Sequence, residues 1–160
     1  MYQLGTKSKQ RLVGVHPDLV KVVTLAITLS PQDFTVLEGV RTEATQREYV
    51  RTGASQTMDS RHLKGPQGHG RAVDLAAWVA GGIRWEWALY PPIADAMRRA
   101  AIQLGIPVRW GGSWVLLNDL ASLAAVNRSV SDYTAARKAQ RRKAFLDGPH
   151  FELPKSARYP

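Results

Sequence analysis

Two polar stretches of the sequence carry residue types that could bind a metal ion and use it in hydrolysis. The first, SRHLKGPQGHGRAVDL (residues 60–75), contains His62 and ends in an apolar run that carries Asp74. The second, DGPHFEL (residues 147–153), contains Asp147 and His150. The chain has no cysteine, and a catalytic zinc can instead take three histidine or carboxylate ligands and leave the fourth position to water. Two histidines and one aspartate from these stretches fit that count.

A zinc site of this kind would still need a general base. Zinc lowers the pKa of bound water towards ~7 and polarises a carbonyl, but another group must accept the proton. In DGPH, a turn at Gly148 and Pro149 could bring the carboxylate of Asp147 back beside the metal. The same residues also have a purely structural interpretation, in which the histidines lie on the surface or are hydrogen-bonded within the core and Asp147 forms an ordinary turn.

The spacing of apolar residues predicts the elements that position these side chains. Helices are expected over residues 18–29, 43–52 and 91–104, and strands over 34–39, 72–79, 108–110 and 150–153. Residues 118–144 are predicted to be helical, in two pieces broken near residues 127–131. Since helices and strands do not alternate strictly, we expect an α+β fold with helices packed on one face of a small, largely antiparallel sheet.

The run AVDLAAWV (residues 72–79) is predicted to be a strand with one buried face. Side chains of a strand alternate between its two faces. Asp74 therefore points away from the core, on the same face as three apolar neighbours. A carboxylate placed among small apolar residues needs a partner, and a cation is one solution. The expected core-facing residues are Val73, Leu75, Ala77 and Val79, and those beside Asp74 are Ala72, Ala76 and Trp78.

Length and composition indicate one domain over residues 1–160, with 44% hydrophobic residues available for a core. No apolar run reaches the ~18–20 residues of a membrane span. No signal peptide is recognised at the N-terminus, so the protein is expected in the cytoplasm. A net charge of +9 and a pI near 10.3 favour polyanionic partners such as nucleic acid, anionic lipid or wall polymers.

The positive charge is concentrated between residues 128 and 143. One interpretation is a solvated helix face, and the other is a docking patch for an anionic surface. No helix-turn-helix, zinc-finger or RNA-binding signature accompanies the segment, so nucleic acid is not the expected partner. The six cationic residues, which face only Asp132, are Arg128, Arg137, Lys138, Arg141, Arg142 and Lys143.

Five stretches in order resemble motifs of the VanY-like D-alanyl-D-alanine carboxypeptidase superfamily, in its phage branch of L-alanyl-D-glutamate endopeptidases. They are VHPDLVKVV, VLEGVRTEATQ, SRH with GRAVDL, RWGGSW and DGPHFEL. The resemblance covers nearly the whole chain. It implies a Hedgehog/DD-peptidase-like zinc peptidase fold.

The resemblance also assigns roles to individual residues. It implies that His62, Asp74 and His150 are the zinc ligands and that Asp147 is the catalytic acid and base. Arg41, in EGVRT, matches an arginine that contacts substrate and stabilises the oxyanion, and Gln46 matches a glutamine lining the same site. Without the resemblance, Arg41 would be read as a surface arginine paired with Glu38 or Glu43.

Three features depart from the family pattern. The spacing between His62 and Asp74 is longer than in compact relatives, and PQGHG looks like an insertion that makes His69 a rival ligand. Ser113 replaces the usual aspartate of WGGDW, which would brace the site less well. Residues 115–144 form a longer, helical and basic segment, expected to be an insertion that acts as a lid or as a wall-binding element.

The sequence therefore predicts a zinc metallopeptidase that hydrolyses peptidoglycan stem peptides, as a phage endolysin cleaving the L-Ala–D-Glu bond. The alternatives are a D-alanyl-D-alanine carboxypeptidase, a non-catalytic zinc-dependent wall-binding module and, more remotely, a nucleic-acid-binding protein. The expected protein is a monomer that waits in the host cytoplasm until a holin releases it to the periplasm and cell wall.

Overall fold

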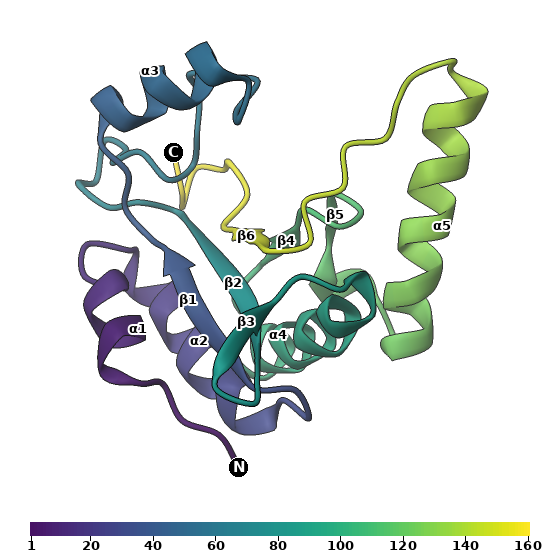
Figure 1. The fold of residues 1–160 in the computed structure, drawn as a ribbon, viewed down its shortest axis with the longest axis horizontal. Helices are drawn as coiled ribbons and strands as arrows, with labels where there is room; N and C mark the ends of the chain where they lie inside the picture. Colours follow the sequence, from purple (N-terminus) through teal and green to yellow (C-terminus); the bar gives the residue numbers. More distant parts are fainter.

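The structure, a computed structural model, describes residues 1–160 and has the predicted α+β architecture (Figure 1). Every pairing between its strands is antiparallel, and the sheet order is β1-β2-β6-β4-β5, with β3 added beside β2. The elements are α1 (Thr6–Arg11), α2 (Pro17–Leu29), β1 (Phe34–Glu38), α3 (Glu43–Thr52), β2 (Ala72–Val79), β3 (Gly82–Arg84), η1 (Trp87–Leu89), α4 (Tyr90–Leu104), β4 (Arg109–Trp110), β5 (Val115–Leu116), η2 (Leu117–Asp119), α5 (Leu123–Ala139) and β6 (His150–Glu152).

Helices α2 and α4 cover one face of the sheet and enclose the core (Figure 1). The apolar residues of α2 recur at helical spacing, so one side of the helix is buried and the other is exposed. Pro17 starts this helix, where its missing N–H needs no partner, and His16 Nδ1 accepts a hydrogen bond from the Asp18 N–H. The core forms one cluster of 28 buried apolar residues.

Strand β2 lies between β1 and β6 and alternates as predicted over most of its length. Val73, Leu75 and Ala77 belong to the core cluster, while Asp74 points to the opposite face. The expectation that Val79 is a core residue is wrong, because it is 36% exposed. At that end β2 has left β1 and pairs only with β3, through Val79 and Gly82.

The pairing register places polar residues of three strands in one row. Asp74 of β2 lies directly opposite Glu38 of β1 and opposite His150 of β6. Residues directly opposite in an antiparallel pair share a face of the sheet. An irregularity between Val36 and Glu38 shifts the register by one residue, so that Glu38 reaches the same face as Asp74 although Val36 is in the core.

Helix α1 was not predicted from the sequence, because its six residues are polar and bury only Ser8. It covers the free edge of β1. The hydroxyl of Ser8 accepts a hydrogen bond from the Val36 N–H at 3.0 Å, and Arg11 donates to the Val36 carbonyl at 2.7 Å. The helix therefore satisfies backbone groups that an edge strand would otherwise leave open.

The segment 115–144 differs from the prediction. It begins with β5 and η2, and its helix α5 runs unbroken from Leu123 to Ala139, while residues 140–144 are not helical. The predicted break at residues 127–131 is absent because this stretch packs on the rest of the protein through the buried residues Val126 and Ser129. The polar side chains there bond to carbonyls within the helix. Asn127 donates to the Leu123 carbonyl at 3.1 Å, and Ser129 donates to the Val126 carbonyl at 2.8 Å.

Candidate metal centre

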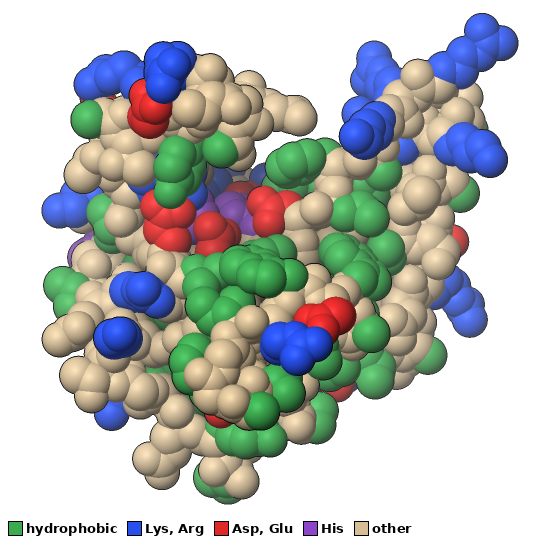
Figure 2. Space-filling view, in the orientation of Figure 1, with side chains coloured by type: hydrophobic (Ala, Val, Ile, Leu, Met, Phe, Trp, Pro, Cys, Tyr) green, Lys and Arg blue, Asp and Glu red, His purple; other side chains and the backbone are tan.

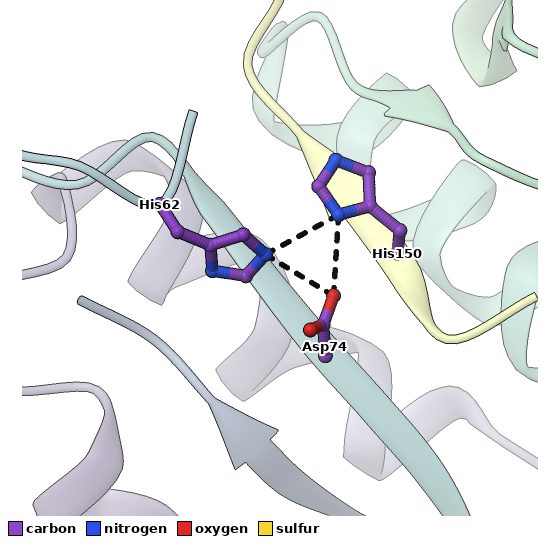
Figure 3. Close-up of side chains that lie close together, drawn as sticks. All are labelled: His62, Asp74 and His150. Carbon is purple, nitrogen blue, oxygen red and sulfur yellow. Dashed lines mark hydrogen bonds and ion pairs between the residues drawn. The ribbon is translucent and has the colours of Figure 1, made fainter. Parts of the chain in front are cut away.

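His62, Asp74 and His150, the three residues that the resemblance implied as ligands, meet in one cluster (Figure 3). His62 Nε2 lies 3.2 Å from Asp74 Oδ1 and 3.3 Å from His150 Nδ1, and Asp74 Oδ1 lies 3.2 Å from His150 Nδ1. Three ligand atoms of a tetrahedral zinc site, each about 2.0–2.1 Å from the ion, lie about 3.3 Å apart. The cluster therefore has the donor types and spacing of a zinc site with one position left for water or substrate.

Each histidine is oriented by an acceptor behind its ring. The Nδ1 of His62 lies 2.7 Å from the Gly39 carbonyl, and the Nε2 of His150 lies 2.8 Å from Glu152 Oε2. When a ring is neutral, its one proton lies towards this acceptor, so the nitrogen that faces the cluster can offer its lone pair to a metal ion. Metal-binding histidines are usually held in this way by outer carbonyl and carboxylate groups.

Gly39 is required at its position by close packing. A Cβ there would lie 2.1 Å from the Arg11 carbonyl oxygen, which is far inside contact distance. The chain can therefore pass next to α1 and turn its carbonyl towards His62 only with glycine at residue 39.

The charges around the cluster favour a bound cation. Burial alone would raise the pKa of Asp74, but hydrogen bonds from His150 and His62 outweigh it and lower the pKa well below its usual range. Burial would lower the pKa of His150, but Asp74 and Glu152 raise it to about 10. A metal ion at Nδ1 of His150 would take the place of a proton there, as metal binding to histidine generally does.

Asp147 lies in the cleft that contains the cluster but is not one of the three clustered groups. Its N–H donates to the Gly111 carbonyl at 3.0 Å, and the chain turns at Gly148 and Pro149 before β6. A Cβ at Gly111 would lie 2.5 Å from the Asp147 carbonyl oxygen, so this close approach needs glycine. Burial raises the pKa of Asp147, which suits a carboxylate that must both accept and donate a proton.

Arg41 also lines the cleft, and its side chain is held from several sides. Its guanidinium donates to both carboxylate oxygens of Glu38 and to Gln46 Oε1, the latter at 2.6 Å. It also lies 3.9 Å from Asp74 Oδ2 and stacks over the Tyr49 ring. Three of its five N–H groups are used in these hydrogen bonds, which leaves two for a ligand.

Gln46 is fully buried in α3 and does not line the cleft. Its amide nitrogen donates to Ser55 Oγ at 2.8 Å and to the Thr57 carbonyl at 2.6 Å, while its oxygen accepts from Arg41. The side chain therefore connects Arg41 to the loop after α3. This placement makes Gln46 a positioning residue for Arg41, behind the cleft wall, whereas the resemblance implied a glutamine that lines the site.

His69 is not part of the cluster. Its ring packs edge-on against His16, with ring centroids 5.6 Å apart, and it does not line the cleft. His62 lies earlier in the same loop and is held beside the residues that follow β1, because the N–H of Arg41 donates to the His62 carbonyl at 3.0 Å. Of the two candidate ligands in this loop, His62 is therefore the one that lies beside Asp74.

Ser113, which replaces the aspartate usual in the family, contacts helix α5. It is buried, and its hydroxyl shares a 2.8 Å hydrogen bond with the hydroxyl of Ser129 in α5. The next residue, Trp114, has a positive φ of 59° and lines the cleft, where its ring lies 5.7 Å from that of His150. A non-glycine residue in this conformation is uncommon and is often found at functional sites.

Sequence reasoning missed the role of Glu152 and its partner Arg109. Glu152 Oε1 accepts from Arg109 Nε at 2.8 Å while Oε2 accepts from His150, so an Arg–Glu–His chain reaches the cluster. The signal was present, because His150 and Glu152 are two residues apart in a strand and therefore share a face. The separate strand that supplies Arg109 could not be placed beside them from sequence alone.

The cluster lies in an open cleft of about 1000 Å³ between α3 with its following loop and the segment that returns from α5 (Figure 1). In Figure 2 a histidine and acidic side chains are visible in this hollow, with hydrophobic side chains beside it. The cleft walls include Arg41, Trp85, Trp114, Phe145, Asp147 and Lys155. None of the helices combines the length and apolar character needed to cross a bilayer.

Comparisons with known proteins indicate the family to which the chain belongs. A model of the family "Phage L-alanyl-D-glutamate peptidase" matches residues 1–154. The chain is 34% identical over 121 residues to an L-alanyl-D-glutamate peptidase of Escherichia phage T5, which covers 71% of this chain and 82% of that protein. The crystal structure of the Serratia marcescens L-Ala D-Glu endopeptidase ChiX matches with a TM-score of 0.71 and 42% identity, over 95% of this chain and 90% of that one. The resemblance of the motifs is thus confirmed, and the chain belongs to the phage L-alanyl-D-glutamate peptidase family.

Proposed function

We propose that this protein is a zinc-dependent endolysin that hydrolyses the L-Ala–D-Glu bond of peptidoglycan stem peptides. The observation that carries the proposal is the triangle of His62 Nε2, Asp74 Oδ1 and His150 Nδ1, with sides of 3.2–3.3 Å and an acceptor behind each ring. Family membership supports the choice of bond. The donor set supports zinc, which binds histidine and carboxylate in a tetrahedral site.

The proposed reaction divides the work among three groups. A bound zinc ion supplies a Lewis acid that polarises the peptide carbonyl and makes water more acidic. Asp147 takes the proton of the attacking water and passes it to the leaving amine, as a general base and then a general acid. The two free N–H groups of Arg41 bind the oxygen on which negative charge develops, while Glu38 and Gln46 fix the guanidinium in place.

The bond that is cut distinguishes the proposed activity from its alternatives. Purified sacculi are digested with the protein, and the products are identified by mass spectrometry. New L-Ala carboxyl ends and D-Glu amino ends are the expected result. Released D-Ala would identify a carboxypeptidase, and unchanged sacculi that retain the protein would identify a wall-binding module.

We also propose that the basic tip docks the enzyme on an anionic wall or outer-membrane surface. The basic tip comprises Arg137, Lys138, Arg141, Arg142 and Lys143, of which all but the half-buried Arg137 are exposed. Helix α5 projects from the body of the protein, and Lys and Arg side chains gather on its far end (Figures 1 and 2). The residues that follow the insertion, Phe145 and Asp147, line the cleft, so the basic tip and the cleft wall are distinct parts of the chain.

The remaining features of the proposal concern the whole chain. The single cluster of 28 buried apolar residues supports one catalytic domain over residues 1–160. We propose that this domain acts as a monomer, remains in the host cytoplasm until a holin releases it, and then reaches the cell wall.

A further inference from the structure

Three large apolar side chains are exposed on the face of the sheet that carries Asp74. We call Trp78, Ile83 and Trp85 the aromatic ledge; their exposed fractions are 38%, 37% and 61%. Exposed apolar groups that cluster beside a cleft indicate a binding surface more often than isolated ones do. In Figure 2 hydrophobic side chains are gathered beside the hollow of the metal centre.

The register of the strands connects this ledge to the metal centre. Asp74, Ala76 and Trp78 alternate with the core residues of β2 and therefore share one face. Ile83 of β3 lies directly opposite Trp78, and Trp85, just after β3, lines the cleft itself. Four residues of a strand span about 13 Å, so Trp78 lies about that far from Asp74 along β2, with the fully buried Ala76 between them. Trp85 is the residue through which the ledge meets the cleft.

The cleft has a different chemical character at its other end. Ala72 of β2 pairs with Glu152 of β6, and Glu152 pairs in turn with Arg109 of β4, so these residues form one row across the sheet. This row lies on the opposite side of Asp74 from Trp78. Arg109 pairs with Glu152 but is 40% exposed and lines the cleft, and Lys155, which forms no ion pair, lines it as well. On the ledge side, the charged neighbours Arg84 and Glu86 pair with each other and neutralise their charges.

We infer that the aromatic ledge binds the glycan strand of peptidoglycan next to the stem peptide. This inference rests on the proposed function. In peptidoglycan, the L-Ala of the stem is joined through a lactyl group to the muramic acid sugar, while D-Glu carries a free carboxylate. Cleavage between these two residues puts an uncharged sugar on one side of the metal centre and an acidic peptide on the other.

The two ends of the cleft match the two ends of this substrate. Two extended residues span about 7 Å, so a sugar attached through one residue and a lactyl group lies at the near edge of the ledge. The C–H faces of a pyranose ring are apolar and stack on indole rings, whose broad faces bury large apolar areas. The acidic remainder of the stem then lies towards Arg109 and Lys155, where a carboxylate finds cationic partners.

The experiment compares two soluble substrates. One is a muropeptide, in which a tetrapeptide stem is joined to the GlcNAc–MurNAc disaccharide, and the other is the same tetrapeptide without sugar. We expect the wild-type protein to show a kcat/KM about 10-fold higher on the muropeptide, equivalent to about 1.4 kcal/mol. Trp85→Ala should bring this ratio close to one, mainly through KM, because a stacking contact binds ground state and transition state alike. Trp85→Phe should keep most of the preference, and Ile102→Ala, an exposed apolar change on α4, should keep all of it.

A ratio that is one in the wild type, or that Trp85→Ala leaves unchanged, would overturn the glycan subsite. A second measurement tests the ledge without turnover, using tryptophan fluorescence with peptide-free glycan strands in the wild type and in Trp78→Ala. Weaker binding in the variant supports the ledge, whether or not the two soluble substrates are cleaved. Failure to cleave either substrate would contradict the proposed function alone. Binding that is absent, or equal in both proteins, counts against the ledge.

Discussion

Replacing Glu152 with Gln should weaken zinc binding without unfolding the protein. Glu152 is 3% exposed and accepts from His150 Nε2 at 2.8 Å with one oxygen, while the other accepts from Arg109. A glutamine has one acceptor and one donor end, so it cannot face both donors. Either the His150 ring loses its acceptor, or an amide N–H is directed at the Arg109 guanidinium.

The size of the effect follows from this geometry. Loss of an outer partner of a metal-binding histidine lowers metal affinity about 10–100-fold, which corresponds to about 1.4–2.7 kcal/mol. The fold should be affected less, because Arg109 is 40% exposed and can turn its charge to water when it loses its partner.

Competition with a chromogenic chelator measures the zinc dissociation constant, and thermal unfolding followed by circular dichroism measures the fold. Glu48→Gln is the matched control, since Glu48 pairs with Arg51 on the exposed face of α3 and should change neither quantity. Zinc affinity within twofold of the wild type in Glu152→Gln, with a normal melting curve, would refute the orienting role of Glu152.

Four further variants test the site and the basic tip. Asp147→Asn should retain zinc and the fold but lose about 10²–10⁴-fold in kcat, the range for acid–base catalysis. His62→Ala should lose zinc and activity, whereas His69→Ala should keep bound zinc because its ring packs on His16. Changing four residues of the basic tip to Gln should weaken sacculus binding at low salt and flatten its salt dependence, because exposed charges are screened over about 8–10 Å at physiological ionic strength; these are Arg137, Lys138, Arg141 and Arg142.

Each of these expectations has a contrary result. Loss of zinc in Asp147→Asn would make that residue a ligand. Loss of zinc in His69→Ala with retention in His62→Ala would reverse the assignment of the loop histidines. Normal sacculus binding by the four-residue variant, with failure on a small soluble stem peptide, would show that the basic tip belongs to the active site.

The parts of the site that could be predicted are those encoded by local periodicity. The alternation of β2 separates Asp74 from the core residues Val73 and Leu75, and the helical spacing of α2 and α4 identifies the layer beneath the sheet. The helix α5 was predicted as two pieces broken near residues 127–131, but it is continuous, and Val126 and Ser129 within it are buried. Tertiary packing of this kind overrides local sequence preferences.

The contacts that complete the site depend on distant parts of the chain. The Gly39 carbonyl that faces His62 belongs to a residue packed closely against the end of α1, and the partner of Glu152 comes from a two-residue strand, β4. Neither contact leaves a periodic signal in the sequence. The position of Gln46 behind Arg41 likewise follows from the loop at Ser55 and Thr57, to which its amide is bonded.

The most direct test of the central claim is a zinc titration of metal-free protein, with cleavage of purified sacculi followed by mass spectrometry. We predict that metal-free protein releases no fragments. New L-Ala carboxyl ends and D-Glu amino ends should then appear in proportion to added zinc and reach a plateau at about one zinc per chain, the single site that the cluster of His62, Asp74 and His150 provides. Full cleavage at the same bond by metal-free protein would contradict the account.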